Sequence, residues 1–280
     1  MLDYKEGGIS VKRTFLLIIS LLSLTIAGCS TNASESGVKT KEVEKETVGM
    51  GWKHENPAAP TAGEWEPISF PDGTTYRLDP PPENDSEETK KDLEELKNLA
   101  TNRTEEDIKI INKWAGEIYG PNTRWFTIAE EMLGKYNLAP PEAARVHYIL
   151  SGTIYTSSVA AFHEKYRYLR PRPTHLDPTL QLIDNFSVPA HPSYPSAHST
   201  TGWAAYTILT FMFPEDEDTF LALVRESDLS RKLAGVHFES DNKAGKQLGT
   251  NVAIDVIKSL ENDPSIHPYD SKSIQMGSGH

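Results

Sequence analysis

The chain has 280 residues, of which 38% are hydrophobic and 24% are charged, and this is the composition of an ordinary globular protein. The length is enough for one sizeable hydrophobic core, so one main domain is expected. A formal net charge of -12 at pH 7 argues against nucleic acid as a partner, because a protein that binds the phosphate backbone needs a basic surface. Any anion site must therefore be a local positive pocket in an acidic protein.

The N-terminal segment, residues 1–29, resembles an export signal. Lys12-Arg13 precedes an apolar run over residues 15–27, which is shorter than the roughly 20 residues of a membrane-spanning helix. The run leads into Ile26-Ala27-Gly28-Cys29, which is similar to a bacterial lipobox, the motif whose cysteine is diacylated and becomes the first residue of the mature protein. Cys29 is also the only cysteine, so no disulfide can form within the chain. We therefore expect an exported protein, anchored to the bacterial cell membrane by a lipid on Cys29 and facing outside the cytoplasm.

Two segments without helical periodicity follow the signal. Residues 30–56 are rich in Ser, Thr, Lys and Glu, and they are predicted to be a flexible tether with a reach on the order of 30 Å. Residues 57–85 are rich in proline and are predicted to form an extended arm, with Trp65 and Tyr76 as anchors on the main body.

From residue 86 onward, apolar residues recur at helical spacing. The predicted helices cover residues 86–99, 104–118, 122–136, 141–163, 196–213, 217–233 and 242–260. Thr104-Glu105-Glu106-Asp107 is a capping-box type of helix start, and no strand-like alternation of useful length is present. The sequence therefore predicts an all-α bundle of six or seven helices over residues 86–265, followed by a C-terminal tail of residues 266–280.

Three short clusters between residues 165 and 241 combine side chains that suit an oxyanion. The clusters are Lys165 with Arg172-Pro173, then Pro195-Ser196-Ala197-His198, and then Ser230-Arg231 with His237 and Asp241. A tetrahedral dianion such as phosphate needs cations to neutralise it, N–H groups to bind its oxygens, and imidazoles to move protons or attack phosphorus. The clusters predict a single oxyanion site, with the N–H groups of residues 196–198 at a helix N-terminus directed at the anion.

The order and spacing of these clusters resemble the signature of the superfamily of type 2 phosphatidic acid phosphatases and vanadium-dependent haloperoxidases. That signature reads Lys-x6-Arg-Pro, Pro-Ser-Gly-His and Ser-Arg-x5-His-x3-Asp. Ten of its eleven fixed positions match, and Ala197 is the departure from the family's glycine. An alanine with positive φ would cost roughly 1 to 2 kcal/mol, but alanine suits the start of a helix, which is the interpretation we favour.

The resemblance implies a role for each matched residue. The oxyanion would be bound by Lys165, Arg172, Ser196, the N–H of Ala197 and Arg231. His198 would be the general acid and base, and His237 would be the covalent partner, oriented by Asp241. In a phosphatase the Nε2 atom of His237 would attack phosphorus, and in a haloperoxidase the same atom would coordinate vanadate.

Two further residues bear on the assignment. His191 lies seven residues before His198, where haloperoxidases of the superfamily carry a histidine or phenylalanine beside the vanadate; the prolines around it would equally suit a surface position. Arg170-Pro171 duplicates the Arg-Pro dipeptide, but no lysine lies seven residues before Arg170, so the register of Arg172 is preferred. His237 and Asp241 would share one face if their stretch is helical.

The function expected from this pattern is an acid-phosphatase-type hydrolysis of phosphate monoesters through a phosphohistidine, which needs no cofactor. The compact site favours this activity. The alternative is a vanadate-dependent haloperoxidase, with halide and peroxide as substrates, and the third possibility is a non-catalytic oxyanion-binding lipoprotein. A small soluble substrate is expected in either enzyme, and the sequence leaves the oligomeric state open. No Gly-x-Ser-x-Gly, Walker or His-Glu-x-x-His motif is present, which argues against other hydrolase classes.

The proposed acylation of Cys29 can be tested by substitution. Cys29→Ser should move most of the protein from the membrane fraction to the soluble fraction, because the acyl chains are the expected anchor. Fractionation followed by immunoblotting would measure the shift. Membrane association that persists in this variant would rule out the anchor.

Overall fold

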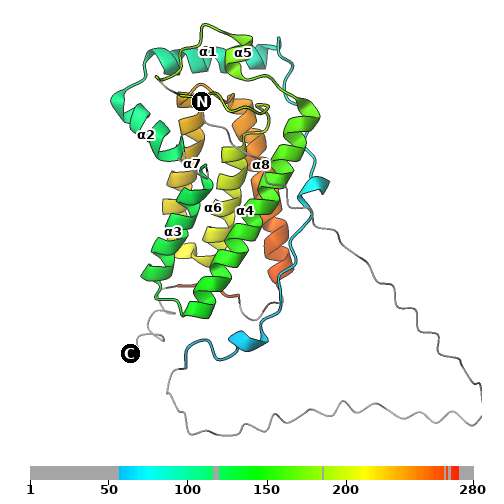
Figure 1. Ribbon diagram of the computed structural model, residues 1–280, viewed down its shortest axis with the longest axis vertical. Helices are drawn as coiled ribbons and strands as arrows, with labels where there is room; N and C mark the ends of the chain where they lie inside the picture. Colours follow the sequence, from blue (N-terminus) through cyan, green and yellow to red (C-terminus); the bar gives the residue numbers. More distant parts are fainter. Residues whose placement is uncertain (1–56, 116–119, 185, 262, 264–265, 271–280) are drawn as a thin grey trace, which may run out of the picture. The chain divides into compact units, whose positions relative to one another are not determined.

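The computed structural model describes residues 57–115, 120–184, 186–261, 263 and 266–270. The chain divides into two compact units, residues 1–52 and 53–280, and every described residue belongs to the second unit. The signal, Cys29 and the expected tether lie outside the described residues. Within the described ranges all regular structure is helical (Figure 1), which confirms the prediction of an all-α fold.

Seven helices of eleven or more residues and one helix of a single turn make up this part of the chain. They are α1 (Glu87–Thr101), α2 (Glu105–Ala115), α3 (Asn122–Lys135), α4 (Pro140–Tyr168), α5 (Pro173–Leu176), α6 (Ala197–Met212), α7 (Glu217–Leu233) and α8 (Glu239–Leu260). Three short 3-10 helices are η1 (Ala62–Glu64), η2 (Gly73–Thr75) and η3 (Pro214–Asp216). The single turn of α5 was not predicted, α4 continues to Tyr168 rather than ending near residue 163, and α8 begins at Glu239 rather than residue 242.

The start of α2 follows the predicted capping box. The N–H of Thr104 donates to Asp107 Oδ2 at 2.8 Å, and the N–H of Asp107 donates to Thr104 Oγ1 at 3.2 Å. These two bonds satisfy donors that the helix itself leaves unpaired. The remaining predicted residues of this helix, 116–118, lie outside the described residues.

Helix α6 is the centre of the bundle. Its sequence is apolar or small on almost every side, and a helix of this kind is stable only when neighbours cover it all round. α4, α7 and α8 each pack along it, and α3 also contacts it. Figure 1 shows α3, α4, α6, α7 and α8 side by side, with α1 and α5 across one end.

Two glycines bring the backbones of α6 and α8 into close contact. A Cβ atom added at Gly245 would lie 2.6 Å from the carbonyl oxygen of Ser196, and one added at Gly249 would lie 2.0 Å from the carbonyl oxygen of Thr200. Both distances are far shorter than atoms tolerate, so these positions need glycine for close approach. This contact fixes the start of α6 against α8.

The proline-rich arm is held along α4 by specific contacts. The Phe70 ring lies where a side chain at Gly152 would be, and the hydroxyl of Tyr76 donates to Asp255 Oδ2 at 3.0 Å. Trp65 lies 6.0 Å from the guanidinium of Arg145. The two aromatic residues expected to anchor the arm therefore both contact the helical body.

Further along the arm, residues 78 and 79 are tied to the helical body and to the loop that precedes α6. The N–H of Leu78 donates to the buried Glu164 at 2.9 Å, and its carbonyl oxygen accepts from Tyr168 at 2.6 Å. The carbonyl oxygen of Asp79 accepts from the Tyr194 hydroxyl at 2.7 Å. The arm thereby supports the loop from outside.

None of the helices in the described part of the chain combines the length and the apolar character that crossing a bilayer requires.

The α6–α8 contact yields a matched pair of glycine substitutions. Gly249→Ala should lower the free energy of unfolding by about 1 to 3 kcal/mol or more, because the added methyl group would clash with the backbone of α6. Gly134→Ala in α3 has open space around its Cβ and should raise stability by up to about 1 kcal/mol. Urea unfolding of both variants would measure the difference. Equal effects would show that α6 and α8 separate at low cost.

Candidate active site

The predicted site residues lie together at the end of the bundle where α4 and α7 end and where α6 and α8 begin. Lys165 lies in the last turn of α4 and Arg231 in the last turn of α7, whereas α6 begins after Ser196 and α8 begins just after His237. α4 and α7 run antiparallel to α6 and α8. The last turns of α4 and α7 and the N-termini of α6 and α8 therefore lie at the same end of the bundle. N-terminal ends of helices attract anions, and cations are favoured in the last turn of a helix. The fold thus concentrates positive potential at this end of an acidic protein.

Arg170 and Arg172 leave the end of α4 in different directions. After α4 the chain turns at Leu169, which has a left-handed conformation with φ of 54°. Arg170 donates to Asp241 Oδ1 at 2.7 Å and lies 4.2 Å from the centre of the Phe238 ring. Arg172 instead reaches His237. The structure therefore places Arg172 at the predicted nucleophile and Arg170 behind it.

Lys165 is fully buried and binds the loop rather than open space. Its Nζ atom donates to the carbonyl oxygens of Pro192, Ser193 and Pro195 at 2.8, 3.0 and 2.5 Å. Burial and the neighbouring charge of Arg172 lower the pKa of Lys165 well below its usual value. The three carbonyl contacts act in the other direction, because an ammonium group has three protons to donate and the neutral amine has two. In this geometry the charge of Lys165 acts on the site in two ways. It holds the loop in place, and its electric field adds to the positive potential of the site.

The start of α6 leaves backbone donors at the predicted position, because within the described residues neither the N–H of Ala197 nor that of His198 has a hydrogen-bond partner. The side chain of Ser196 caps the helix by accepting from the N–H of Ser199 at 3.3 Å. The N–H of Ser196 donates to the carbonyl oxygen of Asp241 at 3.0 Å, so our expectation that this N–H is available to the anion is wrong. Ala197 is the first residue of α6, its φ is not positive, and within the described residues its N–H has no hydrogen-bond partner. Alanine is therefore unstrained here, and the N–H of residue 197 remains as a donor.

A tight turn after α7 explains the spacing between Arg231 and His237. The N–H of Gly235 donates to Lys232 at 2.8 Å and the N–H of Val236 donates to Arg231 at 3.1 Å, which are the two bonds of a Schellman motif. Gly235 has φ of 71°, a conformation that glycine adopts without steric cost. The turn ends α7 and delivers His237 next to Arg231 within six residues.

His237 is oriented by a buried carboxylate. Its Nδ1 atom lies 3.0 Å from Asp241 Oδ2, and its Nε2 atom lies 2.9 Å from Arg172 Nη1. Because a guanidinium group can only donate, Nε2 carries the lone pair and Nδ1 carries the proton. His237 precedes α8, so the two residues do not share a helix face as expected. They meet because Asp241 folds back to cap α8, accepting also from the N–H of Phe238 at 3.1 Å.

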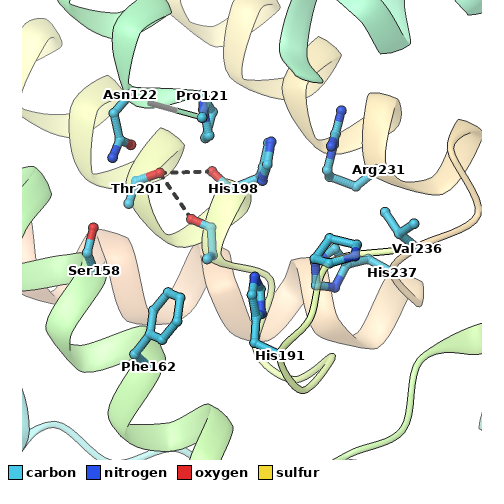
Figure 2. Close-up of a pocket in the computed structure, with 13 residues that line it drawn as sticks. Pro121, Asn122, Ser158, Phe162, His191, His198, Thr201, Arg231, Val236 and His237 are labelled. Carbon is cyan, nitrogen blue, oxygen red and sulfur yellow. Dashed lines mark hydrogen bonds between the residues drawn. The ribbon is translucent and has the colours of Figure 1, made fainter. Parts of the chain in front are cut away.

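His198 faces Arg231 and His237 across the same cavity (Figure 2). Its Nε2 atom lies 3.0 Å from the carbonyl oxygen of Trp114, which can only accept, so Nε2 carries the proton and Nδ1 is left for proton transfer. Burial, followed by the charges of Arg231 and His237, lowers the pKa of His198 well below 6.5. Burial, followed by Arg172 and Lys165, does the same for His237. Both imidazoles are therefore neutral near pH 7, and a bound dianion would favour their protonation.

Arg231 is the cation whose donors are least committed. Within the described residues it donates through Nε to Ser230 at 2.9 Å and through Nη2 to the carbonyl oxygen of Ile111 at 3.5 Å. The guanidinium has five N–H donors, so three have no partner in this part of the chain. Burial lowers the pKa of Arg231 to about 10, which leaves it charged. Arg231 is thus the side chain best prepared to bind an oxyanion directly.

His191 lines the cavity instead of lying on the surface. Its Nδ1 atom is 3.1 Å from Arg172 Nη2, and its ring lies 5.1 Å from that of Phe162. Burial, then the charges of Lys165 and Arg172, lowers the pKa of His191 to about 4. The ring is therefore a neutral, half-buried wall of the site (Figure 2).

The cavity has a volume of about 270 Å³, and its wall opposite the histidines mixes apolar and polar groups. That wall is formed by Gly120, Pro121, Asn122, Ser158, Phe162 and Thr201. Sequence reasoning identified none of these residues, nor Ser193, whose hydroxyl donates to Asp241 Oδ2 at 2.5 Å. Helical register relative to the motif residues could have indicated Ser158, Phe162 and Thr201, whereas Gly120, Pro121 and Ser193 lie outside helices and had no such signal.

Comparison with known proteins agrees with this geometry. The sequence profile of the PAP2 superfamily matches residues 144–263, the segment that contains every predicted residue of the oxyanion site. The non-specific acid phosphatase of Providencia stuartii is 29% identical over 132 residues, which cover 46% of this chain and 52% of that protein. The chain thus matches about half of the length of this relative.

The fold is also found in solved structures. A bacterial vanadium-dependent iodoperoxidase is similar with a TM-score of 0.59 and 22% identity, over 68% of this chain and 54% of that chain. A holo-type bacterial vanadium-dependent chloroperoxidase has a TM-score of 0.53 and 15% identity, over 72% and 54%. The predicted resemblance to the superfamily is confirmed over residues 144–263, and the solved structures show the same type of helical fold.

The depressed histidine pKa values predict that acid destabilises the protein. In the unfolded chain a histidine binds its proton near pH 6.5, whereas the folded protein keeps His191, His198 and His237 neutral to lower pH. The unfolded state therefore binds more protons below pH 6.5, and the free energy of unfolding should fall as the pH falls. His198→Gln should reduce that slope by about 1 kcal/mol per pH unit between pH 6 and 5. Urea titrations at several pH values would test this, and an unchanged slope would contradict it.

Proposed function

We propose that this protein hydrolyses phosphate monoesters by transferring the phosphoryl group first to His237 and then to water. The observation that carries the proposal is the tautomer of His237, whose Nδ1–H is held by Asp241 and whose Nε2 lone pair points at a cluster of cations. A nucleophilic histidine needs this arrangement. The similarity to a non-specific acid phosphatase supports the same activity.

In the first step the Nε2 lone pair of His237 forms a bond to phosphorus while the bond to the ester oxygen breaks. The leaving oxygen takes a proton from Nδ1 of His198, which the dianionic substrate has helped to protonate. Asp241 stabilises the positive charge that develops on the ring of His237. The product of this step is a phosphohistidine and a free alcohol.

In the second step water attacks the phosphohistidine. His198 Nδ1, now neutral, accepts a proton from that water as the new P–O bond forms and the P–N bond breaks. His237 recovers its lone pair at Nε2, and phosphate leaves. One residue therefore acts as acid and then as base.

The charge on the phosphoryl oxygens is neutralised by residues from three elements. Arg231 offers its uncommitted donors, the N–H of Ala197 adds one at the start of α6, and Arg172 turns its Nη1 donor from His237 to the substrate. Lys165 holds the loop in place and adds to the positive electrostatic potential of the site. Preorganised donors of this kind act where charge develops in the transition state.

A second candidate function is a vanadate-dependent haloperoxidase, and the position of His191 favours it. His191 borders the cavity beside Arg172, where it would adjoin an oxyanion held by His237. The residues fit vanadate, because the Nε2 lone pair would be its ligand, and Arg172, Arg231 and the Ala197 N–H would bind its oxygens. When bound, vanadate would supply the oxidation of halide by peroxide. A non-catalytic oxyanion-binding protein is the third candidate.

We further propose that the enzyme acts at the cell envelope, exported and anchored through Cys29. The support is the lipobox-like Ile26-Ala27-Gly28-Cys29 after an apolar run. A small soluble phosphate ester outside the cytoplasm is then the substrate class.

Paired turnover measurements on the full chain carrying Cys29→Ser test these functions. The phosphatase should hydrolyse p-nitrophenyl phosphate without added metal oxyanion, and orthovanadate should inhibit it. His237→Ala should lower kcat at least about a thousandfold, and a phosphopeptide trapped by acid-free quenching should map to His237. His147→Gln, a surface change on α4, is the matched control and should leave turnover unchanged.

The outcomes separate the three candidates. Bromide- or iodide-dependent halogenation that requires orthovanadate and peroxide, and that His191→Ala abolishes, would assign the haloperoxidase. Vanadate binding without either turnover would assign the non-catalytic role. A phosphopeptide that maps to His198 would overturn the assignment of the nucleophile.

A further inference from the structure

Five large side chains form an exposed row on α4, which we call the α4 stripe. The stripe consists of Tyr148, Tyr155, Phe162, Tyr166 and Leu169, which are between 42% and 70% exposed. Only three other large apolar side chains in the described part of the chain are comparably exposed, and they lie on three different helices. Scattered apolar residues are normal on a surface, whereas a continuous row indicates an interaction site.

The spacing of the stripe suits another helix. Residues 148, 155 and 162 are seven apart, which keeps them on one narrow side of α4 over about 20 Å, and Leu169 follows seven residues later at the C-cap of the helix. A heptad repeat of this kind is the seam along which two helices pack lengthwise at a small crossing angle. The side chains along this seam remain exposed, which shows that no helix of the described residues covers it.

The stripe is also symmetric about its midpoint, which lies between Ser158 and Val159. An antiparallel copy of α4 centred there would set Tyr148 against Leu169, Tyr155 against Phe162, and Tyr166 against Ser151. This reciprocity is the requirement of a twofold contact, in which residue i meets residue j and residue j meets residue i. We propose that two copies of this chain associate through their α4 stripes, with the two helices antiparallel.

Side-chain chemistry at the centre of the seam fits this packing. The small Ser158 lies next to the twofold axis and allows the helices to approach there. The Tyr155 and Phe162 rings on either side form two aromatic pairs across the contact, a favourable geometry for such rings. Tyrosine is also enriched at protein interfaces.

The absence of charged side chains on this face favours contact between two copies of the chain. The chain has a formal net charge of -12, so two copies repel each other over most approaches. The five members of the stripe and Ser151 and Ser158 beside them carry no charge. Two acidic copies can therefore meet along this seam without placing like charges opposite each other.

The area of the stripe sets the strength of the association. With about 200 Å² for each aromatic side chain, the exposed fractions give roughly 500 Å² per copy and about 1,000 Å² in total. This is the lower limit for a specific interface, so the dimer should be reversible and dependent on concentration.

The dimer would also extend the active-site wall. Phe162 of the stripe and the adjacent Ser158 both line the cavity that contains His198 and His237. The second copy would place its Tyr155 against Phe162 and thus next to this wall. The inference concerns association and is independent of the proposed function.

Equilibrium sedimentation of the full chain carrying Cys29→Ser tests the proposal. The parent protein should shift from monomer to dimer as its concentration rises. Tyr155→Glu should weaken dimerisation at least tenfold, because it places two carboxylates in the seam. Ile254→Glu is the matched control: Ile254 is 40% exposed on α8, away from the stripe, and its substitution should not change dimerisation. Association through residues 1–56 would be common to all variants and would not distinguish them.

Cross-linking in the same background, which has no other cysteine, tests the orientation. A short bismaleimide should join Tyr148→Cys to Leu169→Cys when the two proteins are mixed, and neither protein to itself. Self-linking of each variant would indicate parallel helices and overturn the antiparallel arrangement. A monomer at every concentration would overturn the proposal altogether. In that case binding to lipid vesicles that Tyr155→Glu abolishes would assign the stripe to a membrane, and a lower Tm of that variant would assign it to another segment of the chain.

Discussion

One buried carboxylate, Asp241, connects the parts of the site. Its Oδ1 atom accepts from Arg170, and its Oδ2 atom accepts from His237 and from the hydroxyl of Ser193. Its backbone carbonyl accepts the N–H of Ser196. The end of α4, the loop before α6, the start of α6 and the proposed nucleophile are therefore all bonded to one fully buried residue. A buried carboxylate is tolerable only when such partners surround it, and losing one partner would leave charge uncompensated.

Among the cations of the site, Lys165 has a structural role comparable to that of Asp241. Within the described residues it has no carboxylate partner, and it is held by three carbonyl oxygens of the loop that runs over it. The positive charge of the site is thereby kept unneutralised, as an anion site in an acidic protein requires. The arm reinforces the same loop from outside through Tyr194 and Asp79, so a segment outside the match to the superfamily also supports the site.

Much of the fold was predictable because its signals are local. Helical spacing and the capping box at Thr104 indicated six or seven helices, and the motif spacing indicated which side chains converge. Contacts between distant segments could not be predicted, because the spacing of residues does not encode them. The N–H of Ser196 is satisfied by Asp241, 45 positions away, and Arg170 reaches the same residue across 71 positions. Only the folded chain reveals that a donor expected to face an anion already has a partner.

In the proposed enzyme, the hydrogen bond between Arg172 and His237 would favour doubly charged anions over singly charged ones. Arg172 also donates to the carbonyl oxygens of His191 and Val236 and contacts the His191 ring, so any anion competes against bonds that already exist. A monoanion, such as a sulfate monoester or a phosphodiester, would offset less of the free energy of breaking those bonds than a dianion would. The reason is that its attraction to the cationic cluster is about half as large. If the protein acts as proposed, phosphate monoesters would therefore be preferred to singly charged analogues because of the resting contacts of one guanidinium group.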